Sequence, residues 1–141
     1  MKKIFAIVLA AAMLLSMTAC GAAAKKDTYV VGICQLVQHD ALDAATKGFQ
    51  DALTEALGDK GKFEVQNASG DSVNCGTIVN GFVSKGVDLI MANATPALTA
   101  AVSATADIPI LGTSITAYGV ALDIDDFNGT VGGNVSGTSD L

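Results

Sequence analysis

Two kinds of hydrophobic pattern alternate along this chain. Short β-branched apolar runs are typical of strands buried on both faces of a parallel sheet. Longer stretches carry apolar residues at intervals of three and four, which is typical of helices packed against such a sheet. The pattern predicts strands at 29–36, 63–67, 87–93, 108–112 and 120–124, and helices at 40–57, at 71–85 and from Thr95-Pro96 onward.

Capping residues support these boundaries. Asp40 is the expected N-cap of the first helix, and Gly58 is its expected stop. Thr95 is the expected cap of the third helix, with Pro96 at the first helical position. The resulting order, βαβαβαβ with one further strand, predicts an α/β fold with a doubly wound parallel sheet.

The first residues have a different character. A basic start at Lys2-Lys3, an apolar stretch at 4–19 and small residues just before Cys20 predict a signal peptide over residues 1–19. The apolar stretch is shorter than the roughly 20 residues of a membrane span. Met17-Thr18-Ala19-Cys20 resembles the lipobox of bacterial lipoproteins, which implies lipidation of Cys20, a linker at 20–28 and anchoring at the outer side of the cytoplasmic membrane. A lipobox more often has leucine at the position of Met17. The alternative is therefore an ordinary signal peptide that is followed by a cysteine only by chance.

Charge and cysteine content narrow the function. The net charge is −6 and the chain has no arginine, so it lacks the basic surface that nucleic-acid binding requires. Cys34 and Cys75 have no neighbouring histidine or cysteine in the sequence, which argues against a metal site. Two interpretations of this pair stay open: a disulfide in an exported protein, or two small buried apolar side chains.

Motifs of catalysis and cofactor binding are missing from the sequence. The segment Gln35 to His39 has no glycine where a dinucleotide fingerprint needs them, and no phosphate-binding loop follows any strand. Gly112-Thr113-Ser114-Ile115-Thr116 lacks the second glycine of a nucleophile elbow. We therefore expect neither an enzyme nor a cofactor.

In a doubly wound sheet, ligands bind outside the carboxyl ends of the strands. Here those ends are polar, as in any α/β protein, at 35–40, 67–71, 92–95 and 113–116. Thr95 and Asp71 fit equally well as helix caps or as ligand contacts, and His39 fits a capping or surface role as well as a ligand contact. Because the chain has no arginine, the carboxylate of a ligand would have to be held by hydroxyl groups and backbone amides. The ammonium group of a ligand could be held by Asp71 or Asp40. Gln35 suggests a cleft, because a primary amide at the end of an apolar strand needs partners.

Several segments, taken together, resemble one family. They are Val31 to Ala45, Gln66 to Asp71, Ala94 to Ala97, Asp107 to Ile110 and Gly132 to Asp140. In order and spacing they are similar to the substrate-binding lipoproteins of ABC transporters of the tryptophan/tyrosine type. The resemblance implies lobe 1 of a two-lobed type I periplasmic-binding protein, with the N-terminal ligand-binding lobe at 29–126 and a hinge crossover toward a second lobe at 127–141.

The resemblance also implies a set of ligand contacts. They are Gln35, Leu36, His39, Asp71, Ala94, Thr95, Ser114 and Thr116. One segment departs from the family: many relatives read Thr-Asp-Pro where this chain has Thr116-Ala117-Tyr118, so an ammonium contact from that loop is in doubt. Tyr118 fits two roles, an aromatic wall of the cleft or an exposed turn residue.

The expected function is capture of a small molecule, with an aromatic amino acid favoured, between two hinged lobes for delivery to a membrane permease. A ligand sensor of the same fold, signalling to a membrane kinase or chemoreceptor, is the alternative. An isolated lobe would expose the face its partner covers, so we expect residues 21–141 alone to bind ligand weakly or not at all and to tend to self-associate.

Overall fold

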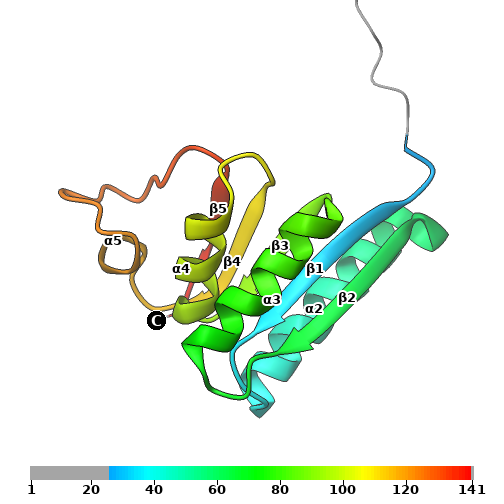
Figure 1. Cartoon of the computed structure of the whole chain (residues 1–141), viewed down its shortest axis with the longest axis horizontal. Coiled ribbons are helices and arrows are strands. Elements are labelled where there is room, and N and C mark those ends of the chain that lie inside the picture. Colours follow the sequence, from blue (N-terminus) through cyan, green and yellow to red (C-terminus); the bar gives the residue numbers. More distant parts are fainter. Residues whose placement is uncertain (1–25, 141) are drawn as a thin grey trace, which may run out of the picture.

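The computed structural model describes residues 26–140, which form a five-stranded parallel sheet covered by helices (Figure 1). The strands run in the order β2-β1-β3-β4-β5. The elements are β1 (Tyr29–Gln35), α2 (Asp40–Leu57), the 3₁₀ turn η2 (Gly58–Lys60), β2 (Gly61–Asn67), α3 (Ser72–Lys85), β3 (Leu89–Asn93), α4 (Thr95–Ala104), β4 (Ile110–Ile115), α5 (Tyr118–Ala121) and β5 (Val135–Ser139). The predicted doubly wound α/β class is confirmed.

The expected signal peptide at 1–19, the lipidation site Cys20 and the first part of the linker lie outside the described residues, as does Leu141. Within residues 26–140, no helix combines the length and the hydropathy needed to cross a membrane.

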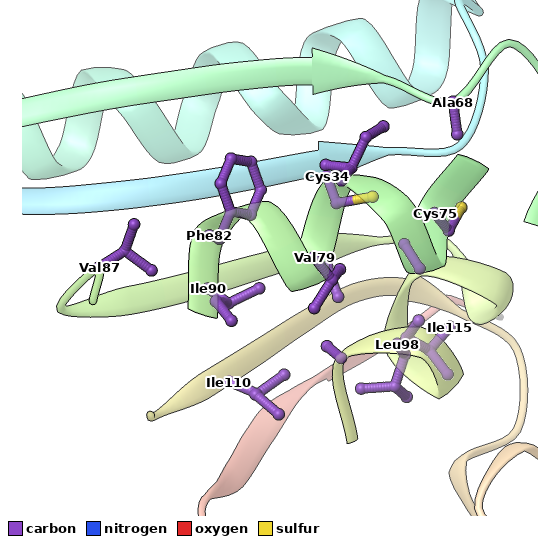
Figure 2. Packing of buried hydrophobic residues seen from close by; sticks show 14 of the residues in the cluster. Cys34, Ala68, Cys75, Val79, Phe82, Val87, Ile90, Leu98, Ile110 and Ile115 are labelled. Atoms are coloured by element: carbon purple, nitrogen blue, oxygen red, sulfur yellow. The ribbon is translucent and has the colours of Figure 1, made fainter. Parts of the chain in front are cut away.

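Helices cover both faces of the sheet (Figure 1). On one face, Val31, Ile33 and Met91 pack against Phe49 and Leu53 of α2. On the other face, α3 and α4 lie side by side and enclose the larger core cluster (Figure 2). Its largest fully buried side chains include Phe82, Ile90, Leu98, Ile110 and Ile115. The alternation of strand side chains between the two faces is what the near-continuous apolar runs of the sequence predicted.

A close helix-to-sheet contact occurs at Gly32, in the middle of β1. A Cβ atom at this position would lie 2.6 Å from two atoms of the Phe82 ring. The missing side chain therefore lets the aromatic ring of α3 rest directly on the strand, as glycine commonly does where another group approaches the backbone closely.

The prediction of a strand at 120–124 is wrong. Residues Tyr118–Ala121 form the short helix α5, and Val120 is 85% exposed. Local hydrogen bonds from Ala121 to Ala117 and from Leu122 to Tyr118 satisfy the backbone there. A short apolar run fits a helical turn as well as a strand, and here the local hydrogen bonds hold the turn.

The fifth strand is β5 instead, within the segment expected only to cross toward a second lobe. It pairs in parallel with β4 through Ile110↔Val135, Leu111↔Ser136 and Gly112↔Gly137. Just before it, the Asn134 side-chain amide donates hydrogen bonds to the carbonyls of Thr105 and Ile108, at 3.2 and 2.7 Å. This strand has no apolar alternation to reveal it, because four of its five residues are exposed.

The fourth strand and two helix starts also differ from expectation. β4 runs over Ile110–Ile115 rather than 108–112. The N-cap of α2 is His39, not Asp40, because the imidazole accepts the Ala41 N–H. The N-cap of α4 is Ala94, not Thr95, and it makes no side-chain capping bond.

The chain enters the sheet through a polar contact at the amino end of β1. Lys26 forms an ion pair with Asp88, which stands between α3 and β3, and Asp88 also accepts the Val30 N–H at 2.8 Å. The hydrogen bond from Lys26, followed by that from Val30, holds the pKa of the Asp88 carboxyl below its usual value.

This contact predicts a pH-dependent contribution to stability. A lowered folded-state pKa stabilises the fold above the usual carboxyl pKa, and the stabilisation disappears as pH falls through the lowered value. Asp88→Asn is expected to lower the free energy of unfolding by about 1 kcal/mol at pH 7, since the pair is partly exposed. Urea titrations at pH 7 and at about pH 3 should show the difference between variant and parent shrinking at low pH. An equal difference at both pH values would contradict the assignment.

Candidate ligand-binding edge

The carboxyl ends of β1, β2, β3 and β4 meet at one edge of the sheet, because all four strands are parallel. Backbone hydrogen bonds join the loops that leave them. Ala68 donates to the Gln35 carbonyl at 2.9 Å, Leu36 to Asn93 at 3.2 Å and Ala94 to Thr113 at 3.0 Å. The four segments predicted to face a ligand are therefore neighbours along this edge, which we call the carboxyl edge.

Two of the predicted residues act as caps at this edge. The His39 Nδ1 accepts the Ala41 N–H at 3.2 Å, and the Asp71 carboxylate accepts the Val73 N–H at 2.8 Å. Both residues are exposed. Capping occupies one acceptor of each side chain, so the second Asp71 oxygen remains a possible partner for a cationic group.

The start of α4 has the features of an anion site. Ala94 has φ 96° and ψ 156° and offers no capping side chain, while Thr95 and Pro96 follow as half-buried helical residues. The first N–H groups of an α-helix have no partner within the helix, and its dipole favours negative charge there. This start of α4 directly adjoins β4, because Ala94 is bonded to Thr113.

The β4 loop contributes hydroxyl groups. Ser114 is half-buried with φ 56°, at an irregularity in the β4–β5 register, and Thr116 is exposed. Ser69, in the loop after β2, has φ 57°. Left-handed backbone at non-glycine residues is uncommon and gathers at functional sites, and Ser69, Ala94 and Ser114 all lie near the carboxyl edge.

Gln35 is held from inside the protein. It is 4% exposed; its amide nitrogen donates to the Val37 carbonyl at 2.9 Å and to Asp43 at 2.5 Å, and its oxygen accepts from Thr46 at 2.7 Å. The argument that this amide needs a ligand to satisfy it is therefore wrong. Two of its three partners, Asp43 and Thr46, belong to α2, so Gln35 fixes that helix to the end of β1.

Asn93 extends this network and was not singled out from the sequence. The fully buried side chain at the end of β3 donates to the Leu42 carbonyl at 2.8 Å and to the Thr46 hydroxyl at 2.9 Å. Its Oδ1 has no hydrogen-bond partner among the described residues. The sequence offered one sign of this role, a polar residue at the end of an apolar strand. Its hydrogen-bond partners could not be predicted, because they lie 47 and 51 residues away along the chain.

Of the two roles considered for Tyr118, the exposed turn residue is wrong, whereas the aromatic wall stays a prediction, because Tyr118 lines a hollow beside Thr116. The residue is 7% exposed, and its hydroxyl donates to the Thr138 carbonyl at 3.4 Å. Burial raises the pKa of this phenol. Tyr118 therefore ties α5 to β5 and belongs to the core.

Hollows border the edge at two places. One of about 530 Å³ is lined by Thr116, by α5, and by Phe127 and Ser139. Another of about 310 Å³ lies beside Gln35, Thr46 and Asn67. Leu36 is half-buried in the loop between β1 and α2.

Charge near the edge comes mostly from carboxylates and backbone groups. Lys47 lines the smaller hollow but forms an ion pair with Asp51, while Lys26 and Lys85 pair with Asp88 and Glu64. Among residues 26–140, no group of three or more histidine, cysteine or acidic side chains is placed to hold a metal ion. The edge offers dipoles, hydroxyls and carboxylates, which suit a small zwitterion.

Comparison with known families gives a match over residues 30–141 to the model for ABC transporter substrate binding proteins. The chain belongs to this family. Members of the family bind substrates and are not enzymes, in agreement with the missing catalytic motifs.

Individual relatives agree with this placement. A tyrosine-binding protein of Clostridioides difficile (strain R20291) is 44% identical over 116 residues, covering 78% of this chain and 32% of that protein. Among solved structures, an ABC domain in complex with L-Trp from Streptococcus pneumonia is 35% identical with a TM-score of 0.72, covering 79% of this chain and 38% of that one. A ligand-free, open substrate-binding protein with adhesive properties from Clostridium difficile is 41% identical, with a TM-score of 0.74 and coverages of 81% and 39%.

The chain therefore spans about a third of the length of the curated relative and under two fifths of these solved chains.

Proposed function

We propose that this chain is the ligand-binding first lobe of an extracytoplasmic substrate-binding protein that captures an aromatic amino acid for an ABC permease. The observation that carries the proposal is the start of α4 at the carboxyl edge, which lacks a side-chain cap. The tyrosine and tryptophan named for the relatives support the aromatic class.

In this proposal the ligand carboxylate lies at the N-terminus of α4, near Thr95 and Ser114, and the ammonium lies near Asp71. His39, Leu36, Ala94 and Thr116 border the same space, and Gln35 supports it from below. A second lobe completes the cavity, and closure follows because a ligand that contacts both lobes favours the closed state.

The ligand assignment predicts a requirement for the carboxylate. Calorimetry on the full-length protein should detect L-tyrosine or L-tryptophan binding, and tyramine and tryptamine should bind at least about tenfold more weakly, since one charge-assisted hydrogen bond contributes roughly 1.5–3 kcal/mol. Equal affinity for the amines and the amino acids would contradict the carboxylate site. No binding of any aromatic amino acid would overturn the proposed ligand class.

A matched pair of variants tests the position of the site. Thr95→Val removes a hydroxyl at the start of α4 and is expected to weaken binding by about tenfold. Thr99→Val removes a hydroxyl one turn later on the same helix, where it bonds to the Thr95 carbonyl at 3.1 Å, and should leave affinity unchanged. Equal affinities for the two variants would place the ligand elsewhere.

The lipid anchor is a separate part of the proposal. If Cys20 is lipidated, Cys20→Ala should release the protein from the membrane fraction and abolish labelling by a fatty-acid analogue. Labelling that persists in the variant would exclude Cys20 as the lipidation site.

The sensor role remains the alternative, and it has the same binding edge. Deletion of a neighbouring permease gene would separate the two, since uptake of the ligand stops only if the protein serves transport.

A further inference from the structure

Two cysteines meet in the core beneath the carboxyl edge. Cys34 precedes the last residue of β1, and Cys75 lies near the start of α3. Both are fully buried in the same apolar cluster. Figure 2 shows both side chains in the layer between β1 and α3, at the end of the strand near Ala68, and both cysteines are free.

We propose that Cys34 and Cys75 form an intrachain disulfide when the chain folds in the presence of a disulfide-bearing oxidant. The two side chains come from facing elements and share one buried cluster, and no other cysteine is found among residues 26–140. The bridge joins a central strand to the helix packed on it. Disulfides persist in the oxidising environment outside the cytoplasm.

The chemistry is thiol–disulfide exchange in two steps. One cysteine thiolate attacks a sulfur of the oxidant, which forms a mixed disulfide and releases one thiolate of the oxidant. The second cysteine thiolate then attacks its partner's sulfur in that mixed disulfide, which forms the intrachain bond and releases the other oxidant thiolate. The two protons of the cysteines pass to the two leaving thiolates, and the oxidant is reduced by two electrons.

Burial explains when this exchange takes place. It raises the pKa of the Cys34 thiol to about 12, and it raises the pKa of Cys75 as well. The reactive thiolate is therefore scarce in the folded protein at neutral pH. Exchange proceeds during folding, before the pair is covered, and the finished bond is shielded from reducing thiols.

The positions of the lysines allow tryptic peptide mapping to detect the Cys34–Cys75 bond directly. Trypsin cleavage after Lys26, Lys47, Lys62 and Lys85 places Cys34 alone in peptide 27–47 and Cys75 alone in peptide 63–85. Full-length protein is refolded with oxidised glutathione, trapped with iodoacetamide in denaturant and digested without reduction. The expected product is the two peptides joined, lighter by two hydrogens than their sum, and separated by reductant. Two singly alkylated peptides without the joined species would overturn the proposal.

A stability measurement adds an independent criterion. The oxidised protein should melt about 5–10 °C above the reduced protein, since a bridge that closes a long loop stabilises typically by a few kcal/mol. Cys34→Ala and Cys75→Ala should each melt at the same temperature with and without reductant. Monomer mobility on a non-reducing gel must be retained, because a joined peptide pair from a covalent dimer would contradict an intrachain bond. These experiments need no ligand, so their outcome is independent of the proposed function.

Discussion

Phe82→Ala is expected to lower the free energy of unfolding by about 3–5 kcal/mol, the usual range for removing a buried aromatic side chain. The ring is fully buried and lies against Gly32 of β1 on the underside of α3. Its removal leaves a cavity where helix and strand meet, and nearby glycine offers no side chain to fill it. Urea denaturation followed by far-UV circular dichroism measures the loss.

A double-mutant cycle with Gly32 tests the geometry behind this expectation. Gly32→Ala alone should cost about 1–3 kcal/mol, because the added Cβ overlaps the ring. In the Phe82→Ala background the same substitution should cost little or should stabilise, because the cavity accepts a methyl group. Gly81→Ala is the control, since its Cβ would meet nothing within 4 Å in α3; a gain of about 0.5–1 kcal/mol is expected there. Additive effects of the two core substitutions would contradict the contact.

Gly137→Ala is expected to detach β5 from the sheet. A Cβ here would lie 2.2 Å from the backbone oxygen of Gly112 and 2.0 Å from the Tyr118 hydroxyl. The strand must move because backbone atoms cannot turn aside as a flexible side chain can. A loss of at least about 1–3 kcal/mol is expected, together with faster amide exchange in Val135–Ser139.

Ser136→Ala provides the matched control for this strand. It changes the exposed residue next to Gly137 without adding an atom at the crowded position. Stability and amide exchange should stay within the range of ordinary surface substitutions, about 0.5 kcal/mol. If the β5 amides of Gly137→Ala exchanged as slowly as those of the wild type, the strand would not depend on the close approach of Gly137 to Gly112.

Most of the fold up to Ile115 could be predicted because its local pattern and its burial agree. Tyr29–Gln35 reads as a buried strand and is one, and Asp40–Leu57 has helical spacing and is a helix. After Ile115 this agreement ends. β5 is held by a close approach of two glycines and by the Asn134 side chain, which are tertiary features that hydrophobic periodicity does not record.

The site shows the same division between local and distant information. The topology of parallel strands predicts which loops meet, and the described loops are joined by backbone hydrogen bonds. The hydrogen-bond partners of a particular polar side chain could not be predicted from the sequence. Gln35, for example, bonds to Asp43 and Thr46 in the following helix. Short polar side chains such as Thr95 fit capping and binding equally well in sequence, and only the backbone angles at Ala94 show which residue is the cap.

The positions where the chain enters and leaves the sheet have a mechanical consequence. β1 is entered at its amino end beside the Lys26–Asp88 pair, and β5 forms one edge of the sheet, separated from β1 by β3 and β4 (Figure 1). Tension applied along the chain would pull these parallel strands in opposite directions along their own axes. The ladders of β3 and β4 between them would then share the load in shear, where many hydrogen bonds must break together, rather than open one bond at a time.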